Sequence, residues 1–145
     1  MATLKELLGG DKRPAVINDA LRVLDQEVAD KGGLSGIGIK TAFKVVKGIG
    51  ADFLRKVVDH LLDDFLDALD PIYQEALEQN KKPGAHLRSD PPRVANALLA
   101  ITDGRAKRAD NQVVRKAYGK LRGIAQKQVE AAAPRLGDML DRHTA

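Results

Sequence analysis

A glycine-rich segment, LSGIGIKTAFKVV at residues 34–46, carries the residue types that hold a phosphate group. Gly36 and Gly38 flank a single isoleucine, and Lys40 follows two residues later. Backbone amides exposed in a glycine turn, together with the N-terminus of a following helix, bind anions, and a nearby lysine adds positive charge. The segment is therefore open to two interpretations: a phosphate-binding turn, or a tight corner between two helices.

The same segment resembles the helix-hairpin-helix motif, in which an apolar-x-Gly-apolar-Gly turn joins two helices and holds a DNA phosphate without reading bases. Leu34 matches the leading apolar residue of that motif, and residues 36–38 match its turn. The resemblance implies that Gly36 and Gly38 donate backbone amides to the phosphate. It also implies that Lys40 supplies positive charge and that Ile37 anchors the turn.

The alternative interpretation places a helix over these residues. The pair at 32–33 is Gly-Gly and already ends the preceding helix, which leaves residues 36–38 free to be helical under a Ser35 N-cap. Lys40 and Lys44 then lie on the solvated side of that helix. The chain has five aromatic residues and no tryptophan, so stacking on nucleic-acid bases has little support. We therefore favour the helical corner.

Charge is distributed unevenly along a chain whose formal net charge is +4. Residues 59–78 contain seven acidic and no basic residues, whereas residues 105–127 contain eight basic residues and one acidic residue. Within the basic stretch, Lys116 and Lys120 are four residues apart and project together on a helix. The two stretches either face each other in the fold or present separate surfaces to partners, and the sequence does not choose between these arrangements.

Residues suited to catalysis or metal binding are sparse. His60 precedes Asp63 and Asp64 by three and four residues, a spacing that would let these side chains share a metal on one helix. The same spacing is typical of an ordinary acidic helix surface, which is what we expect here. No cysteine, Ser-His-Asp order, phosphate-binding P-loop or zinc signature is present in the sequence. We expect no catalytic residues, no metal and no cofactor, and a protein that is not an enzyme.

Apolar residues recur at helical spacing almost throughout the chain, which predicts an all-α fold of six or seven helices in one domain over residues 1–145. Helices are expected from Pro14 to residue 31, over a central segment at 51–69, and from Asp90 to residues 104–109. A break or kink is expected at residues 70–71, which are Asp-Pro, followed by a shorter helix. The final helix runs from about residue 111 toward 133, and Pro134 starts or kinks a terminal segment.

Other features of the fold follow from turn residues and glycines. Residues 80–92 are rich in turn-forming types and predict a loop. Gly119 and Gly123 lie on one face of the last long helix and predict the close approach of another helix backbone. Replacement of one predicted core residue, Leu61, by alanine is expected to lower the free energy of unfolding by about 2–5 kcal/mol. The predicted core consists of Leu54, Val58, Leu61, Leu62, Phe65, Leu98, Leu121 and Ile124.

Four segments taken in order, KGGLSGIGIKTAFKVVKGI, ALLAITDGRAKRA, AYGKLRGIA and APRLGDML, resemble a family of small bacterial proteins of about this length that is known only as uncharacterised. The resemblance covers the whole chain. It brings no activity or ligand, so no functional residue is carried over from it. It implies that residues 34–46 belong to a larger single-domain pattern and are not a detachable DNA module.

Two classes of function remain. The favoured one is a cytoplasmic helical interaction or scaffold protein that binds a protein partner; no apolar run approaches the length of a membrane span, and we expect no membrane partner. The alternative is weak, sequence-independent binding of a DNA or RNA backbone, which would fall steeply as salt rises. The candidate contacts of this alternative are Gly36, Gly38, Lys40, Lys44, Lys116 and Lys120.

Overall fold

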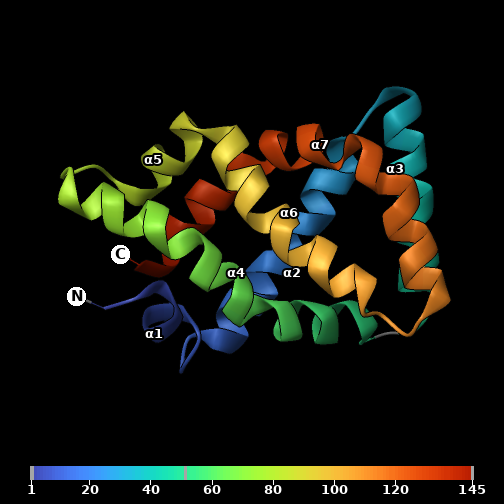
Figure 1. Cartoon of the computed structure of the whole chain (residues 1–145), viewed down its shortest axis with the longest axis horizontal. Coiled ribbons are helices and arrows are strands. Elements are labelled where there is room, and N and C mark those ends of the chain that lie inside the picture. The colour runs from blue at the N-terminus through green and yellow to red at the C-terminus, as the bar shows by residue number, and fades with distance from the viewer. Residues whose placement is uncertain (1, 51, 145) are drawn as a thin grey trace.

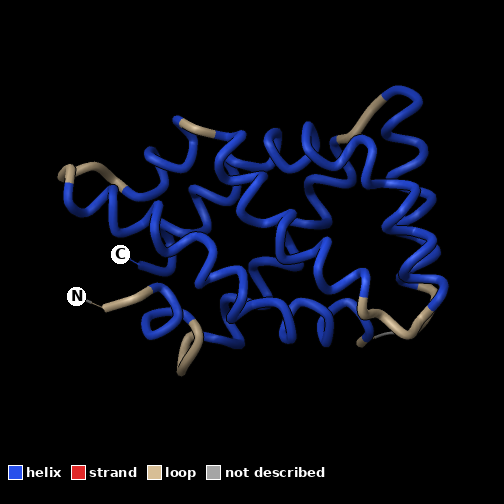
Figure 2. The backbone as a smooth tube through the Cα atoms, in the orientation of Figure 1, coloured by secondary structure: helices blue, strands red, loops and turns tan. Residues whose placement is uncertain are grey.

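Regular structure in this chain is built from α-helices joined by short connections (Figures 1 and 2). The computed structural model describes residues 2–50 and 52–144, and these residues contain no β-strand. The predicted all-α fold is therefore confirmed, with seven helices in the described residues. In chain order they are α1 (Leu4–Leu8), α2 (Arg13–Asp30), α3 (Gly33–Lys47), α4 (Phe53–Glu78), α5 (Pro83–Ser89), α6 (Pro91–Lys107) and α7 (Gln112–Thr144).

The longest helix, α7, links two differently built ends of the molecule (Figure 1). Its first half packs beside α3 at one end. Its second half packs against α5 at the other end, where α1 and both ends of the described chain also lie. Helices α2, α4 and α6 fill the space between these ends. Any site on α3 and early α7 is thus remote from the chain termini.

Two prolines predicted to interrupt helices lie inside continuous ones. Of the break or kink expected at residues 70–71, the break and the separate shorter helix are wrong, because α4 runs through Pro71 to Glu78; a kink there stays a prediction. A buried apolar face continues across the proline, and its burial offsets the lost hydrogen bond. Asp70 does not begin a new helix; its Oδ1 accepts from the backbone amide of Leu4 at 2.9 Å and so pairs the first amide of α1, whose N-cap is Thr3. Likewise, α7 continues through Pro134.

The predicted loop at 80–92 is also wrong in its middle, where residues 83–89 form α5. Pro83 suits the first turn of a helix, and Leu87 is only 1% exposed. At the end of this segment, the predicted start of the next helix is confirmed. The side chain of Asp90 accepts from the amide of Arg93 at 3.3 Å, as an N-cap does.

The hydrophobic core lies closer to α1 and α5 than predicted. Of the predicted core residues, Leu62 is buried, and Val58 and Leu98 pack partly buried against the core. The other five, Leu54, Leu61, Phe65, Leu121 and Ile124, are only partly buried, so their assignment to the core is wrong. The core cluster consists of Leu4, Leu8, Val16, Ile17, Leu62, Leu66, Leu69, Ile72, Tyr73, Leu87, Val94 and Leu140.

A buried carboxylate fastens the end of α7 to α2. Asp19 is 9% exposed, and its carboxylate accepts from the guanidinium of Arg142 at 2.9 Å and from that of Arg22 at 2.6 Å. Its Oδ2 also lies 2.9 Å from Nε2 of His143. Burial would raise the pKa of Asp19, but these three hydrogen-bonding partners outweigh burial and hold the pKa below its ordinary value.

We expect the substitution Asp19→Asn to lower the free energy of unfolding by about 2 kcal/mol at pH 7, because Arg142 then loses its buried anionic partner. A carboxylate with a lowered pKa stabilises the fold above its unfolded value of 3.8, and this contribution disappears as pH falls below 3.8. Urea unfolding at pH 7 and near pH 3 should show the difference between parent and variant shrinking in acid.

The matched control is Asp25→Asn, which removes an exposed ion pair with Lys47. Asp25 is 56% exposed, so this change should cost no more than about 0.5 kcal/mol. Equal losses from the two substitutions, or a difference that persists in acid, would show that Asp19 does not act as a buried ionised anchor.

Candidate functional site

The glycine segment that resembles a phosphate-binding hairpin is helical throughout. Helix α3 begins at Gly33, with Gly32 as its N-cap, so Gly36 and Gly38 lie inside it. The amide of Gly36 donates to the carbonyl of Gly32 at 3.1 Å and is not free to receive a phosphate. The helix-hairpin-helix resemblance is not confirmed, and the helical corner is the observed geometry.

The corner differs from the prediction in one detail. The helix starts three residues before Gly36, so a Ser35 N-cap is wrong. The chain reverses at Gly33, whose φ of +69° is readily adopted by glycine alone. Gly36 is needed for close packing, because a Cβ atom there would lie 2.7 Å from the carbonyl carbon of Lys31 at the end of α2. Gly38 has open space around it.

An apolar groove lies between α3 and the first half of α7, and it has a volume of about 690 Å³. Two valines in it are unusually exposed for apolar side chains: Val45 on α3 at 50% and Val113 on α7 at 42%. Leu121 and Ile124, predicted for the core, line this groove instead. The full lining is Gly38, Thr41, Ala42, Val45, Val113, Lys116, Ala117, Lys120, Leu121 and Ile124.

Four of the six candidate contact residues are lysines, and the structure brings two of them to this groove. Lys116 and Lys120 line its α7 side. Lys40 and Lys44 are exposed on α3 but are not part of the lining, because their helical positions turn them away from the face that carries Gly38, Thr41, Ala42 and Val45. Within the part of the chain that the structure describes, no carboxylate lies within 4.0 Å of any of the four. Gly38 lines the groove, whereas Gly36 lies apart against α2.

The α7 wall of the groove is held from behind by α6. Tyr118 places its hydroxyl 2.8 Å from that of Thr102 and donates to Asp103. Arg122 Nε donates to Asp103 Oδ1 at 2.8 Å. Hydrogen bonds from Arg122 and then Tyr118 lower the pKa of Asp103, so this carboxylate stays ionised. The first half of α7 is thereby fixed in position and oriented.

Most of the acidic stretch at 59–78 is neutralised by parts of the chain other than the basic stretch. Arg13 binds Asp59 at 2.6 Å and Asp63 at 2.8 Å. Arg93 binds Glu75 at 3.0 Å. From the basic stretch, Arg105 reaches Asp64 at 2.7 Å. The acidic and basic stretches therefore meet at one point, and the lysines of α7 are left to present a separate basic surface.

The two carboxylates considered for a metal beside His60 are engaged in ion pairs. As described above, Asp63 and Asp64 each hold an arginine. The backbone carbonyl of His60 accepts from Arg105 at 3.4 Å. Over residues 2–50 and 52–144, no group of three or more histidine and acidic side chains is arranged to hold a metal ion.

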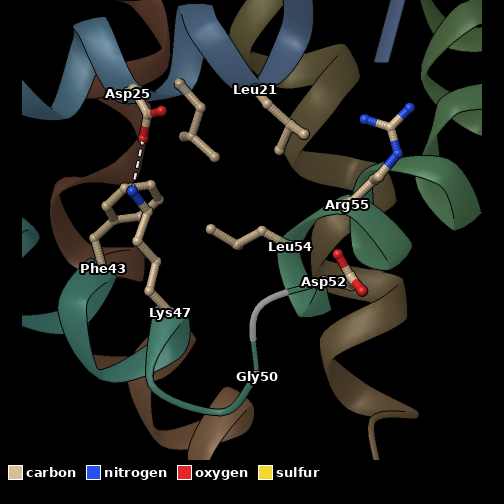
Figure 3. A pocket seen from close by; sticks show the side chains of 9 residues that line it. Leu21, Asp25, Phe43, Lys47, Gly50, Asp52, Leu54 and Arg55 are labelled. Atoms are coloured by element: carbon tan, nitrogen blue, oxygen red, sulfur yellow. Dashed lines mark hydrogen bonds and ion pairs between the residues drawn. The ribbon is translucent and has the colours of Figure 1, made fainter. Parts of the chain in front are cut away.

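A second hollow, of about 470 Å³, lies among α2, α3 and the start of α4, and sequence reasoning did not anticipate it (Figure 3). Leu21 and Leu54 form apolar walls. At its edge, Lys47 passes over the ring of Phe43 at 4.7 Å and binds Asp25 at 3.0 Å. Lys47 is therefore paired within the protein, unlike Lys116 and Lys120 of the α3–α7 groove.

A family model described as a family of unknown function, DUF6918, matches residues 4–144. The chain belongs to this family. The match confirms the resemblance to an uncharacterised family that covers the whole chain, and it includes both helices of the groove. No curated protein and no solved structure matches this DUF6918 chain. Among the described helices, none combines the length and the apolar character that crossing a membrane requires.

Proposed function

We propose that this DUF6918 chain is a non-enzymatic protein-interaction domain, and that a helix of a partner protein docks in the α3–α7 groove. The observation that carries this proposal is the exposure of Val45 and Val113 on the two walls of one groove. Covering a half-exposed valine with a partner side chain contributes about 1 kcal/mol to the free energy of binding. A partner side chain placed between them would thus contribute apolar burial on both sides.

The shape of the groove suits a helix. Its walls are two helices, and a third helix packs against such a pair at interaxial distances of about 8–10 Å. Small residues on both walls, including Gly38, Ala42 and Ala117, permit a close approach. The α7 wall is already fixed by Asp103 and its partners, so little ordering is needed on binding.

The chemistry of the lining supports an interaction role over the other functions considered. The lining includes no histidine and no carboxylate, the groups that most often act as general acid or base. It includes no aromatic side chain on which a base would stack. A nucleic-acid backbone would contact the lysines but leave the valines uncovered.

A photo-cross-linking amino acid at Val45, introduced in the cells that make the protein, tests this function. We expect one defined protein adduct at Val45 and none at Ile49, which is exposed on the α3–α4 connection outside the groove lining. The substitution Val113→Asp in the Val45 derivative should remove the adduct. The identified protein, once purified, should bind the parent chain and lose affinity for the Val113→Asp variant.

Other adducts would contradict the proposal. Cross-linking that is equal at Val45 and Ile49, or absent from both, would mean that the groove is not a docking site. An adduct of twice the chain mass would identify a second copy as the occupant. A nucleic-acid adduct would support the alternative function of backbone binding.

A further inference from the structure

We infer that the helix docking in the α3–α7 groove is acidic as well as amphipathic: its apolar face enters the groove, and carboxylates on the edge of that face contact Lys116 and Lys120 on the α7 wall. This inference rests on the proposed function. It adds the chemistry by which the partner is recognised.

The first step is the charge of the groove. Lys116 and Lys120 line its α7 side. The lining contains no acidic residue that would neutralise them. Two positive charges therefore stand beside an apolar strip, and a neutral or basic partner would leave them without a partner carboxylate.

The second step is that Lys116 and Lys120 differ from several other cations of the same two helices. Lys47 on α3 binds Asp25 at 3.0 Å, and Arg122 on α7 binds Asp103 at 2.8 Å. Near the end of α7, Arg135 binds Glu27 at 3.0 Å. These three cations are paired within the chain, whereas Lys116 and Lys120 at the groove have no such partner in the described residues.

The third step is spacing. Lys116 and Lys120 are one helical turn apart, as are Lys40 and Lys44, and Lys127 continues the α7 row at i+11. Carboxylates at i and i+4 on a partner helix have the same period of about one turn, so consecutive pairs can form along the α7 rim. Covering the apolar strip also lowers the local dielectric and strengthens each pair.

A synthetic amphipathic helix of leucine and glutamate provides the probe, with leucine on one face and glutamate flanking it. The control peptide carries glutamine in place of every glutamate. Fluorescence anisotropy of the labelled peptides should give a dissociation constant about tenfold lower for the glutamate peptide, and the advantage should shrink as salt rises. The double variant K116E/K120E should weaken binding of the glutamate peptide by about tenfold or more.

Matched variants separate charge at the groove from charge in general. The double variant K107E/R108E changes two exposed cations at the end of α6 outside the lining, and it should shift affinity by less than about twofold. K116R/K120R keeps the charge and should keep affinity close to that of the parent. Circular dichroism of each variant confirms that the fold is intact.

Failure of this inference is distinguishable from failure of the proposed function. Equal binding of the glutamate and glutamine peptides, with loss in a V45D/V113D variant, would overturn the acidic partner and leave the docking groove in place. Absence of binding by either peptide, or binding that V45D/V113D does not weaken, would overturn both. Competition by short duplex DNA at the affinity of the glutamate peptide would show that the lysines serve a nucleic acid.

Discussion

Replacing Leu87 with alanine is expected to lower the free energy of unfolding by about 2–5 kcal/mol. Leu87 is 1% exposed and belongs to the main core cluster, in which it brings the short helix α5 against α4 and α7. Seven residues do not form a stable helix alone, so α5 depends on this burial. Urea unfolding followed by circular dichroism measures the loss.

Leu61→Ala provides the comparison, since both substitutions remove the same atoms. Helical periodicity alone predicts a cost of about 2–5 kcal/mol at Leu61 as well, but this residue is only partly buried and lies outside the core cluster. Because Leu61 is only partly buried, we expect Leu61→Ala to lower the free energy of unfolding by about 1 kcal/mol. A loss at Leu61 that matches or exceeds the loss at Leu87 would mean that the core is centred on the other flank of α4.

The contrast between these leucines shows what the sequence can predict. Helical periodicity predicted α2, α6 and the larger parts of α4 and α7, because each buries an apolar stripe, but it did not predict that α4 and α7 continue through Pro71 and Pro134. It did not choose which flank of α4 faces the core, since Leu61 and Leu62 both fit a helix with neighbours on two sides. Turn residues around Pro83 predicted a loop, whereas the packing of Leu87 in the core and the 2.7 Å contact between His86 and Glu75 are tertiary contacts that stabilise this segment as a helix.

The candidate site was predictable in its parts but not in its assembly. The spacing of Lys40, Lys44, Lys116 and Lys120 is enough to identify them as exposed cations. The groove that Lys116 and Lys120 line depends on α3 packing beside α7, and these helices are separated by more than sixty residues of chain. Lys40 and Lys44 lie outside it. The exposed valines would have been the available signal, because Val45 and Val113 fit poorly on the buried faces of their helices.

Two glycine pairs are expected to respond to alanine in opposite directions. Gly84 on α5 and Gly137 on α7 meet where the helices cross backbone to backbone. A Cβ atom at Gly137 would lie 2.6 Å from the carbonyl oxygen of Gly84, and one at Gly84 would lie 2.5 Å from that of Gly137. Either alanine must push the helices apart, which should cost about 3 kcal/mol, because a backbone carbonyl cannot rotate away as a side chain does.

Gly119 and Gly123, predicted to permit such a close approach, are exposed, and a Cβ atom added at either would have no neighbour within 4 Å. Alanine at either should therefore raise the free energy of unfolding by about 1 kcal/mol through helix propensity alone.

Thermal and urea unfolding of the four single variants measures both effects. If Gly119→Ala or Gly123→Ala destabilises the chain, these glycines have a packing role after all. If Gly137→Ala is neutral, the crossing of α5 and α7 is looser than the geometry requires, and α5 must be held mainly by Leu87 and by the hydrogen bond from the Gly84 amide to Asp141 at 2.8 Å.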